Sequence, residues 1–150
     1  MFNNEDIKSQ LSRIDALFIS EKFFSMMTKQ SCDCDEIIIQ NNDNYIKLTS
    51  KLLGEEDSFI DFEKTNFEEA QKYPYEINFE KVDFVFDKTI SLESGEIDGI
   101  RFKGNDVFLF VFASEYNLVL TMSKYDLFEE IHMELPQKEA TLNILKRNHS

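Results

Sequence analysis

One uninterrupted apolar run, residues 107–113, constrains the fold more than any other feature of the sequence. It is rich in phenylalanine and valine, which favour an extended strand. The run is far shorter than the roughly 20 residues that a membrane-spanning helix needs. A strand that is apolar on both faces has to be covered on both sides. We therefore predict that it lies centrally in a sheet, with helices covering at least part of each face.

Polar turns separate this run from other segments that have the composition of strands. The turns at 104–106 and 114–117 are short, which predicts antiparallel neighbours. The alternation slips by one residue between Phe79 and Val82, and a bulge or a strand break would explain the slip. The strands predicted in this half of the chain, besides the apolar run, are residues 75–80, 82–87, 96–103 and 118–122.

A polar quartet at 41–44 interrupts two β-rich segments nearer the start of the chain. Residues 36–40 are dominated by isoleucine, and residues 45–49 alternate between apolar and polar side chains. Both patterns are typical of strands. The sequence therefore predicts a β-hairpin with a four-residue loop.

Helical spacing marks both ends of the chain. Ile7, Leu11, Ile14 and Phe18 recur at helical intervals and predict a helix over residues 5–17. Ser20 can cap a second helix over residues 21–29. Toward the other end, the spacing of the apolar residues predicts a helix that ends near Pro136, which can itself open a final helix. This last helix would carry Ala140, Leu142 and Leu145, with Lys146 and Arg147 at its C-terminal end.

A shorter helix is predicted in the middle of the chain. Thr65, Asn66, Phe67 and Glu68 resemble a capping box, in which polar side chains satisfy the first amide groups of a helix. The predicted helix covers residues 67–73, because Pro74 disfavours helical backbone at the residue before it.

These elements predict one α+β domain over residues 1–150. The length is typical of a single domain, and no repeat or flexible linker divides the chain. We expect an antiparallel sheet of about five to seven strands, which can be strongly curved, with the N-terminal and C-terminal helices packed on it.

No catalytic, cofactor-binding or metal-binding constellation is recognisable. His132 and His149 are the only histidines, and neither lies in a catalytic motif. Cys32 and Cys34 are one residue apart, a spacing that suits neither a disulfide nor the usual half of a zinc site. The four glycines are isolated, so no phosphate-binding loop is predicted.

The start of the chain lacks the pattern of a secretory signal, and two closely spaced cysteines suit a reducing compartment. We therefore expect a cytoplasmic protein. Its net charge of −13 argues against nucleic acid or a membrane as direct partner and permits a basic protein. Residues 55–100 hold 14 of the 29 acidic residues but four of the 16 basic ones, so most of the excess lies there.

Between residues 55 and 69, seven acids and one lysine are interleaved with aromatic and aliphatic residues. We interpret this segment as an acidic surface with aromatic anchors that captures a basic protein, as an immunity protein or inhibitor of a toxin or nuclease does. The predicted partner-binding residues are Glu55, Glu56, Asp57, Phe59, Asp61, Phe62, Glu63, Glu68, Glu69, Glu80 and Asp83.

Three alternatives remain open at this stage. The acidic segment could be a solvated surface whose apolar residues plug into the core. The protein could be a small enzyme that uses a carboxylate pair in an acidic cleft, which predicts a deep pocket. It could also be an accessory subunit that meets its complex through an apolar patch. Composition defines neither the oligomeric state nor the partner.

Overall fold

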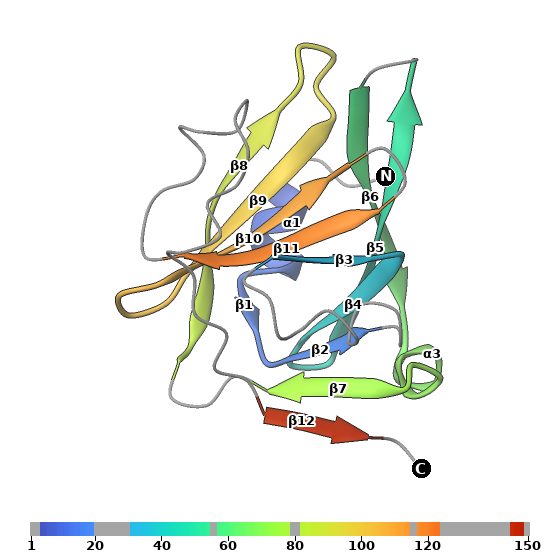
Figure 1. Cartoon of the computed structure of the whole chain (residues 1–150), viewed down its shortest axis with the longest axis vertical. Helices are drawn as coiled ribbons and strands as arrows, with labels where there is room; N and C mark the ends of the chain where they lie inside the picture. The colour runs from blue at the N-terminus through green and yellow to red at the C-terminus, as the bar shows by residue number, and fades with distance from the viewer. Residues whose placement is uncertain are drawn as a thin grey trace.

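The computed structural model describes residues 4–19, 31–54, 57–78, 82–114, 117–123 and 145–148. In this part of the chain, twelve strands form two six-stranded sheets, and every pair of neighbouring strands is antiparallel (Figure 1). Two short helices, α1 (Asn4–Gln10) and α3 (Phe67–Gln71), accompany the sheets.

The first sheet contains the apolar run. Its order is β1-β8-β9-β10-β11-β3, so β10 lies inside the sheet between β9 and β11. This central position was predicted from the composition of the run. The strands are β1 (Arg13–Ile14), β8 (Phe84–Ser91), β9 (Ile97–Lys103), β10 (Phe108–Ala113), β11 (Leu118–Ser123) and β3 (Ser31–Cys34).

The second sheet has the order β12-β7-β2-β4-β5-β6 and ends at β6. The predicted hairpin is confirmed as the β4–β5 pair, but its turn is tighter than expected. Asn41 pairs with Asn44, and Asn42 reaches a positive φ of 56° between them. The strands are β12 (Leu145–Asn148), β7 (Tyr75–Asn78), β2 (Ala16–Ile19), β4 (Glu36–Asn41), β5 (Asn44–Leu53) and β6 (Asp57–Thr65).

One hydrophobic core joins the two sheets. Ile37, Ile39 and Leu48 belong to the same buried cluster as Phe102 and Val111 of the other sheet. Ile7 and Leu11, from α1 and the residue after it, complete this cluster. The burial of apolar side chains between the sheets is the main force that holds such an architecture together.

The outer face of the second sheet, which points away from this core, carries a smaller buried cluster. Ala16, Phe18 and Ile38 pack there against Ala70 and Tyr73 at α3. Because α3 covers this face, all four residues of β2 are buried. On the outer face of the first sheet, Phe110 and Phe112 form a third buried cluster.

The α+β prediction is wrong, because the described chain is predominantly β and has two sheets in place of one. The helix expected over residues 5–17 ends at Gln10, and β1 and β2 follow. Residues 16–19 are apolar without interruption and are covered on both faces, a situation that favours a strand over an amphipathic helix. The helix predicted over residues 21–29 and the predicted helix that ends near Pro136 lie outside the described residues.

The final helix is also wrong where the structure describes it. Leu145, Lys146 and Arg147 belong to strand β12, which pairs with β7 beside β2. Two charged residues at a C-terminus suit a helix end, but they suit the exposed edge of a sheet as well. No helix in the described ranges is long and apolar enough to cross a membrane.

Candidate functional site

The acidic segment forms a strand that the sequence did not predict. Residues 57–65 are β6, which pairs with β5 along nine register positions at the end of the second sheet. The signal was present as alternation: Ile60 is buried, Phe62 packs against the core, and both alternate with acids. The frequent carboxylates made the segment resemble a loop, because aspartate and glutamate are depleted in strands.

The two faces of β6 divide the predicted residues. Phe62 faces the core opposite Leu48, whereas Phe59, Asp61 and Glu63 share the outer face. Of these, Glu63 is exposed and Phe59 and Asp61 are partly buried. Asp57 is exposed at the start of the strand. The outer face therefore gathers the acids together with one of the two predicted aromatic anchors.

Lysines of β5 lie beside these acids. Lys51 Nζ is 3.1 Å from Asp61 Oδ2, and Lys47 stands opposite Glu63 in the register. Lys51 is exposed and Asp61 is partly exposed, and ion pairs near the surface contribute little to stability. The outer face is therefore less negative than the sequence of β6 alone implies.

Helix α3 adds two more of the predicted acids. The Asn66 side chain caps the helix by accepting a hydrogen bond from Glu69 N at 2.9 Å. Glu68 and Glu69 lie in the first turn, where the helix dipole favours negative charge. Glu69 Oε1 is 2.9 Å from Lys72 Nζ, whereas Glu68 is exposed and has no ion pair among the described residues. The predicted helix start is therefore confirmed, but the capping residue is Asn66 and not Thr65, the first residue of the predicted capping box.

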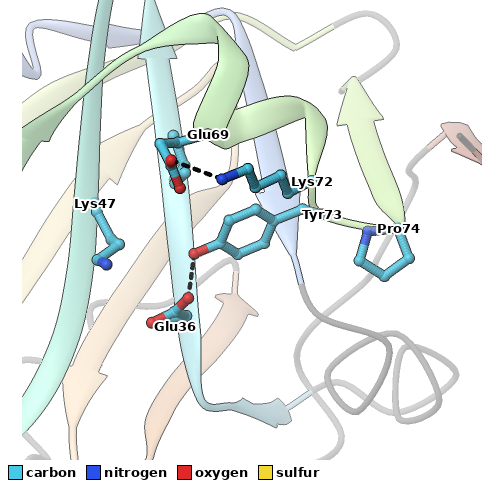
Figure 2. A pocket seen from close by; sticks show the side chains of 7 residues that line it. Glu36, Lys47, Glu69, Lys72, Tyr73 and Pro74 are labelled. Atoms are coloured by element: carbon cyan, nitrogen blue, oxygen red, sulfur yellow. Dashed lines mark hydrogen bonds and ion pairs between the residues drawn. The ribbon is translucent and has the colours of Figure 1, made fainter.

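An open pocket of about 420 Å³ lies between α3 and the outer face of the sheet. Figure 2 shows Tyr73 reaching from the end of α3 toward Glu36 of β4, with the Glu69–Lys72 pair beside it. The lining residues are Glu36, Ile38, Lys47, Glu69, Lys72, Tyr73 and Pro74. Both carboxylates of the pocket are occupied: Glu36 accepts a hydrogen bond from the Tyr73 hydroxyl, and Glu69 is paired with Lys72.

Burial raises the pKa of Tyr73 above its ordinary value of 10.0, and the hydrogen bond to Glu36 and the charge of that carboxylate raise it further. The phenol therefore remains a hydrogen-bond donor at neutral pH. In this arrangement Tyr73 attaches α3 to the sheet, and the pocket does not present two free carboxylates to a substrate.

An aromatic row runs from the interior to the surface beside the acids. The Tyr45 ring lies 6.3 Å from the Phe18 ring and 6.2 Å from the Phe67 ring, measured between centroids. Phe18 is buried, whereas Phe67 is 55% exposed. Burial raises the pKa of Tyr45, as do the negative charges of Asp43, Glu76 and Glu68. The exposed end of the row thus stands in a field of negative charge.

Phe67 was not among the predicted site residues. The capping box could have identified it, since the box places Phe67 at the first position of a five-residue helix whose one buried residue is Ala70. A helix this short has little apolar face to bury, which favours exposure of a large side chain at its start.

The remaining predicted residues do not join this group. Asp83 is exposed just before β8, which belongs to the other sheet. Glu55, Glu56 and Glu80 lie outside the described residues. The structure therefore brings together seven of the predicted residues on β6 and α3, of which Phe62 faces inward.

Among the described residues, the cysteines and possible metal ligands form no recognisable site. The Cys34 side chain is buried in the main core. Within the described ranges, no group of three or more histidine, cysteine, aspartate or glutamate side chains could hold a metal ion.

No family model, curated protein or solved structure matches this chain. The expectation of an immunity protein or toxin–antitoxin component therefore gains no support. The basic protein partner and the cytoplasmic location of this chain remain predictions.

Proposed function

We propose that this chain is a binding protein for a basic protein, and that the partner meets the outer surface formed by β6 and α3. The observation that carries the proposal is the exposed Phe67, which stands next to exposed Glu68 and on the same side of the sheet as Glu63. Aromatic side chains, phenylalanine included, are enriched in the cores of protein interfaces, and carboxylates around them favour a cationic partner.

Two further features support this location. Asp57, Glu63 and Glu68 are exposed and have no ion pair in the described part of the chain, so their charges are available to a partner. The overall charge of −13 adds a long-range field that speeds the approach of a cation. Phe62, which faces the core, has no part in this proposal.

The surface is tested by reversing two charges that have no described ion pair. The variant Glu63→Lys, Glu68→Lys removes both carboxylates and leaves the Lys51–Asp61 and Lys72–Glu69 pairs intact. The matched control is Glu93→Lys, Asp106→Lys, which changes the net charge equally at exposed loops of the first sheet. Affinity capture from the native host, followed by measurement of association rates with the captured protein, compares the two.

We expect the test variant to bind at least tenfold more slowly than the control, and the association rate of the unmodified chain to fall steeply as salt is added. Equal slowing in both variants would show that net charge alone attracts the partner, with no defined surface. An acidic partner, or association that does not depend on salt, would contradict the proposal.

A further inference from the structure

Strand β6 is the longest of the described strands that end a sheet. The strand order ends at β6, and in the described part of the chain its one sheet neighbour is β5. It has nine residues, whereas the other sheet ends, β1, β3 and β12, have two, four and four. Natural proteins usually keep edge strands short, because an open edge is a template for another strand.

The hydrogen-bond pattern shows which backbone groups of β6 point away from β5. Asp15 N donates to Gln40 O, so the backbone of Gln40 faces β2, and that of Asn41 faces β5. The direction of the backbone N–H and C=O groups alternates along a strand, so those of residues 45, 47, 49, 51 and 53 of β5 point toward β6. The backbone groups of their partners in β6, residues 65, 63, 61, 59 and 57, point toward β5. The amide groups of Ser58, Ile60 and Lys64 consequently point outward.

The side chains of β6 select the chemistry of a strand that could pair there. A second copy of β6 would place Asp57, Asp61 and Glu63 near identical carboxylates, and like charges that face each other across strands are destabilising. A strand with lysine or arginine at alternate positions would instead place opposite charges beside these residues. The acids therefore disfavour self-association and favour a basic strand.

We propose that β6 binds an extended basic segment of the partner by strand addition, so that the segment becomes a seventh strand of this sheet. The inference rests on the proposed function, and it adds the conformation of the bound segment and the backbone groups that hold it. In this mode the amides of β6 supply affinity, and the acids of its outer face supply selectivity.

Proline substitution at outward-facing amides tests the backbone contribution. Proline lacks an N–H group and is tolerated on edge strands where that group faces solvent. The variant Ser58→Pro, Lys64→Pro therefore removes two outward donors and leaves the ladder with β5 in place. The matched control, Ser58→Ala, Lys64→Ala, makes the same side-chain losses and keeps both donors. Circular dichroism and urea unfolding confirm that each variant is folded.

Two basic peptides serve as probes of the full chain. One alternates lysine with valine over seven residues and can form a strand; the other alternates lysine with proline and cannot. Amide shifts in a titration followed by nuclear magnetic resonance give the affinity and the site. We expect the lysine–valine peptide to bind along β6, and the proline variant to bind it about tenfold more weakly than the alanine control.

The other outcomes separate the inference from the proposed function. Equal affinity for both peptides, or equal affinity of the proline and alanine variants, would overturn strand addition and leave a basic partner in place. If neither peptide binds, both proposals are overturned. Equal binding of a glutamate–valine peptide would show that charge does not select the strand and would overturn the basic partner.

Discussion

The Tyr73 hydroxyl donates a hydrogen bond to the Glu36 carboxylate and so connects the end of α3 with the first residue of β4. Tyr73 is 9% exposed and packs in the cluster that α3 forms with Phe18 and Ile38. This contact holds α3, with Phe67 and Glu68 at its start, against the outer face of the sheet. The position of the proposed binding surface thus depends on a bond at the opposite end of the helix.

Tyr73→Phe is expected to lower the free energy of unfolding by about 1–2 kcal/mol, because the half-buried Glu36 carboxylate loses a donor. Urea unfolding measures the change. Tyr45→Phe is the control, since the structure gives the Tyr45 hydroxyl no hydrogen bond to the described residues, and we expect it to cost less than half as much. An equal loss in the two variants would contradict the role given to the Tyr73 contact.

The same contact predicts a dependence of stability on alkaline pH. The pKa of Tyr73 is raised in the folded protein, so folding favours the neutral phenol, and this stabilisation is complete below the unfolded pKa of about 10. As the pH rises past 10, tyrosines of the unfolded chain ionise and the stabilisation declines. The difference in unfolding free energy between the unmodified chain and Tyr73→Phe is therefore expected to shrink from pH 9 to pH 11. Urea unfolding at each pH tests this, and a constant difference would refute it.

The sequence predicted the elements whose signals are local. The run at 107–113, the hairpin at 36–49 and the capped helix at Asn66 each depend on neighbouring residues, and all three are present. The helix predicted over residues 5–17 is present only at its start. Ile7 of α1 and Leu11, just after it, are core residues, as the helical spacing predicted. Beyond Gln10, residues 16–19 form a strand because they are buried on both faces. Part of this cover comes from Ala70 and Tyr73, which lie far along the chain.

The candidate site was predicted in part for the same reason. Local composition identified the acids of β6 and α3, but which of them has a lysine partner depends on the register with β5, which places Lys51 near Asp61. The inward direction of Phe62 also follows from that register, because Phe62 pairs with core residue Leu48. The exposure of Phe67 also depends on how α3 docks on the sheet, which the helix-start signal does not encode by itself.

Gly104→Ala is expected to destabilise the protein by about 1–3 kcal/mol through overpacking. A Cβ atom at Gly104 would lie 2.3 Å from Val82 Cγ1 and 3.2 Å from the buried ring of Phe84. Thermal or urea unfolding measures the loss. The double variant Gly104→Ala, Val82→Ala removes the closest contact, so we expect it to be less destabilised than the sum of the two single variants. Strict additivity would contradict the steric explanation.

Arg101→Lys is expected to cost about 1–2 kcal/mol although it preserves the charge, because lysine cannot reproduce the planar fork of arginine. Nε and Nη2 of Arg101 each lie 2.5 Å from Asp87 Oδ2, and the guanidinium group lies 4.8 Å from the centre of the Phe108 ring. The Arg101 side chain is 12% exposed, so water cannot fully replace these contacts. Asp87 is the extra residue at a register shift in the β8–β9 pair, between Phe86 and Lys88, and the contact with Arg101 occupies its carboxylate. Urea unfolding of Arg101→Lys, Asp87→Asn and the double variant gives the coupling energy, and a coupling near zero would show that the two side chains stabilise the sheet independently.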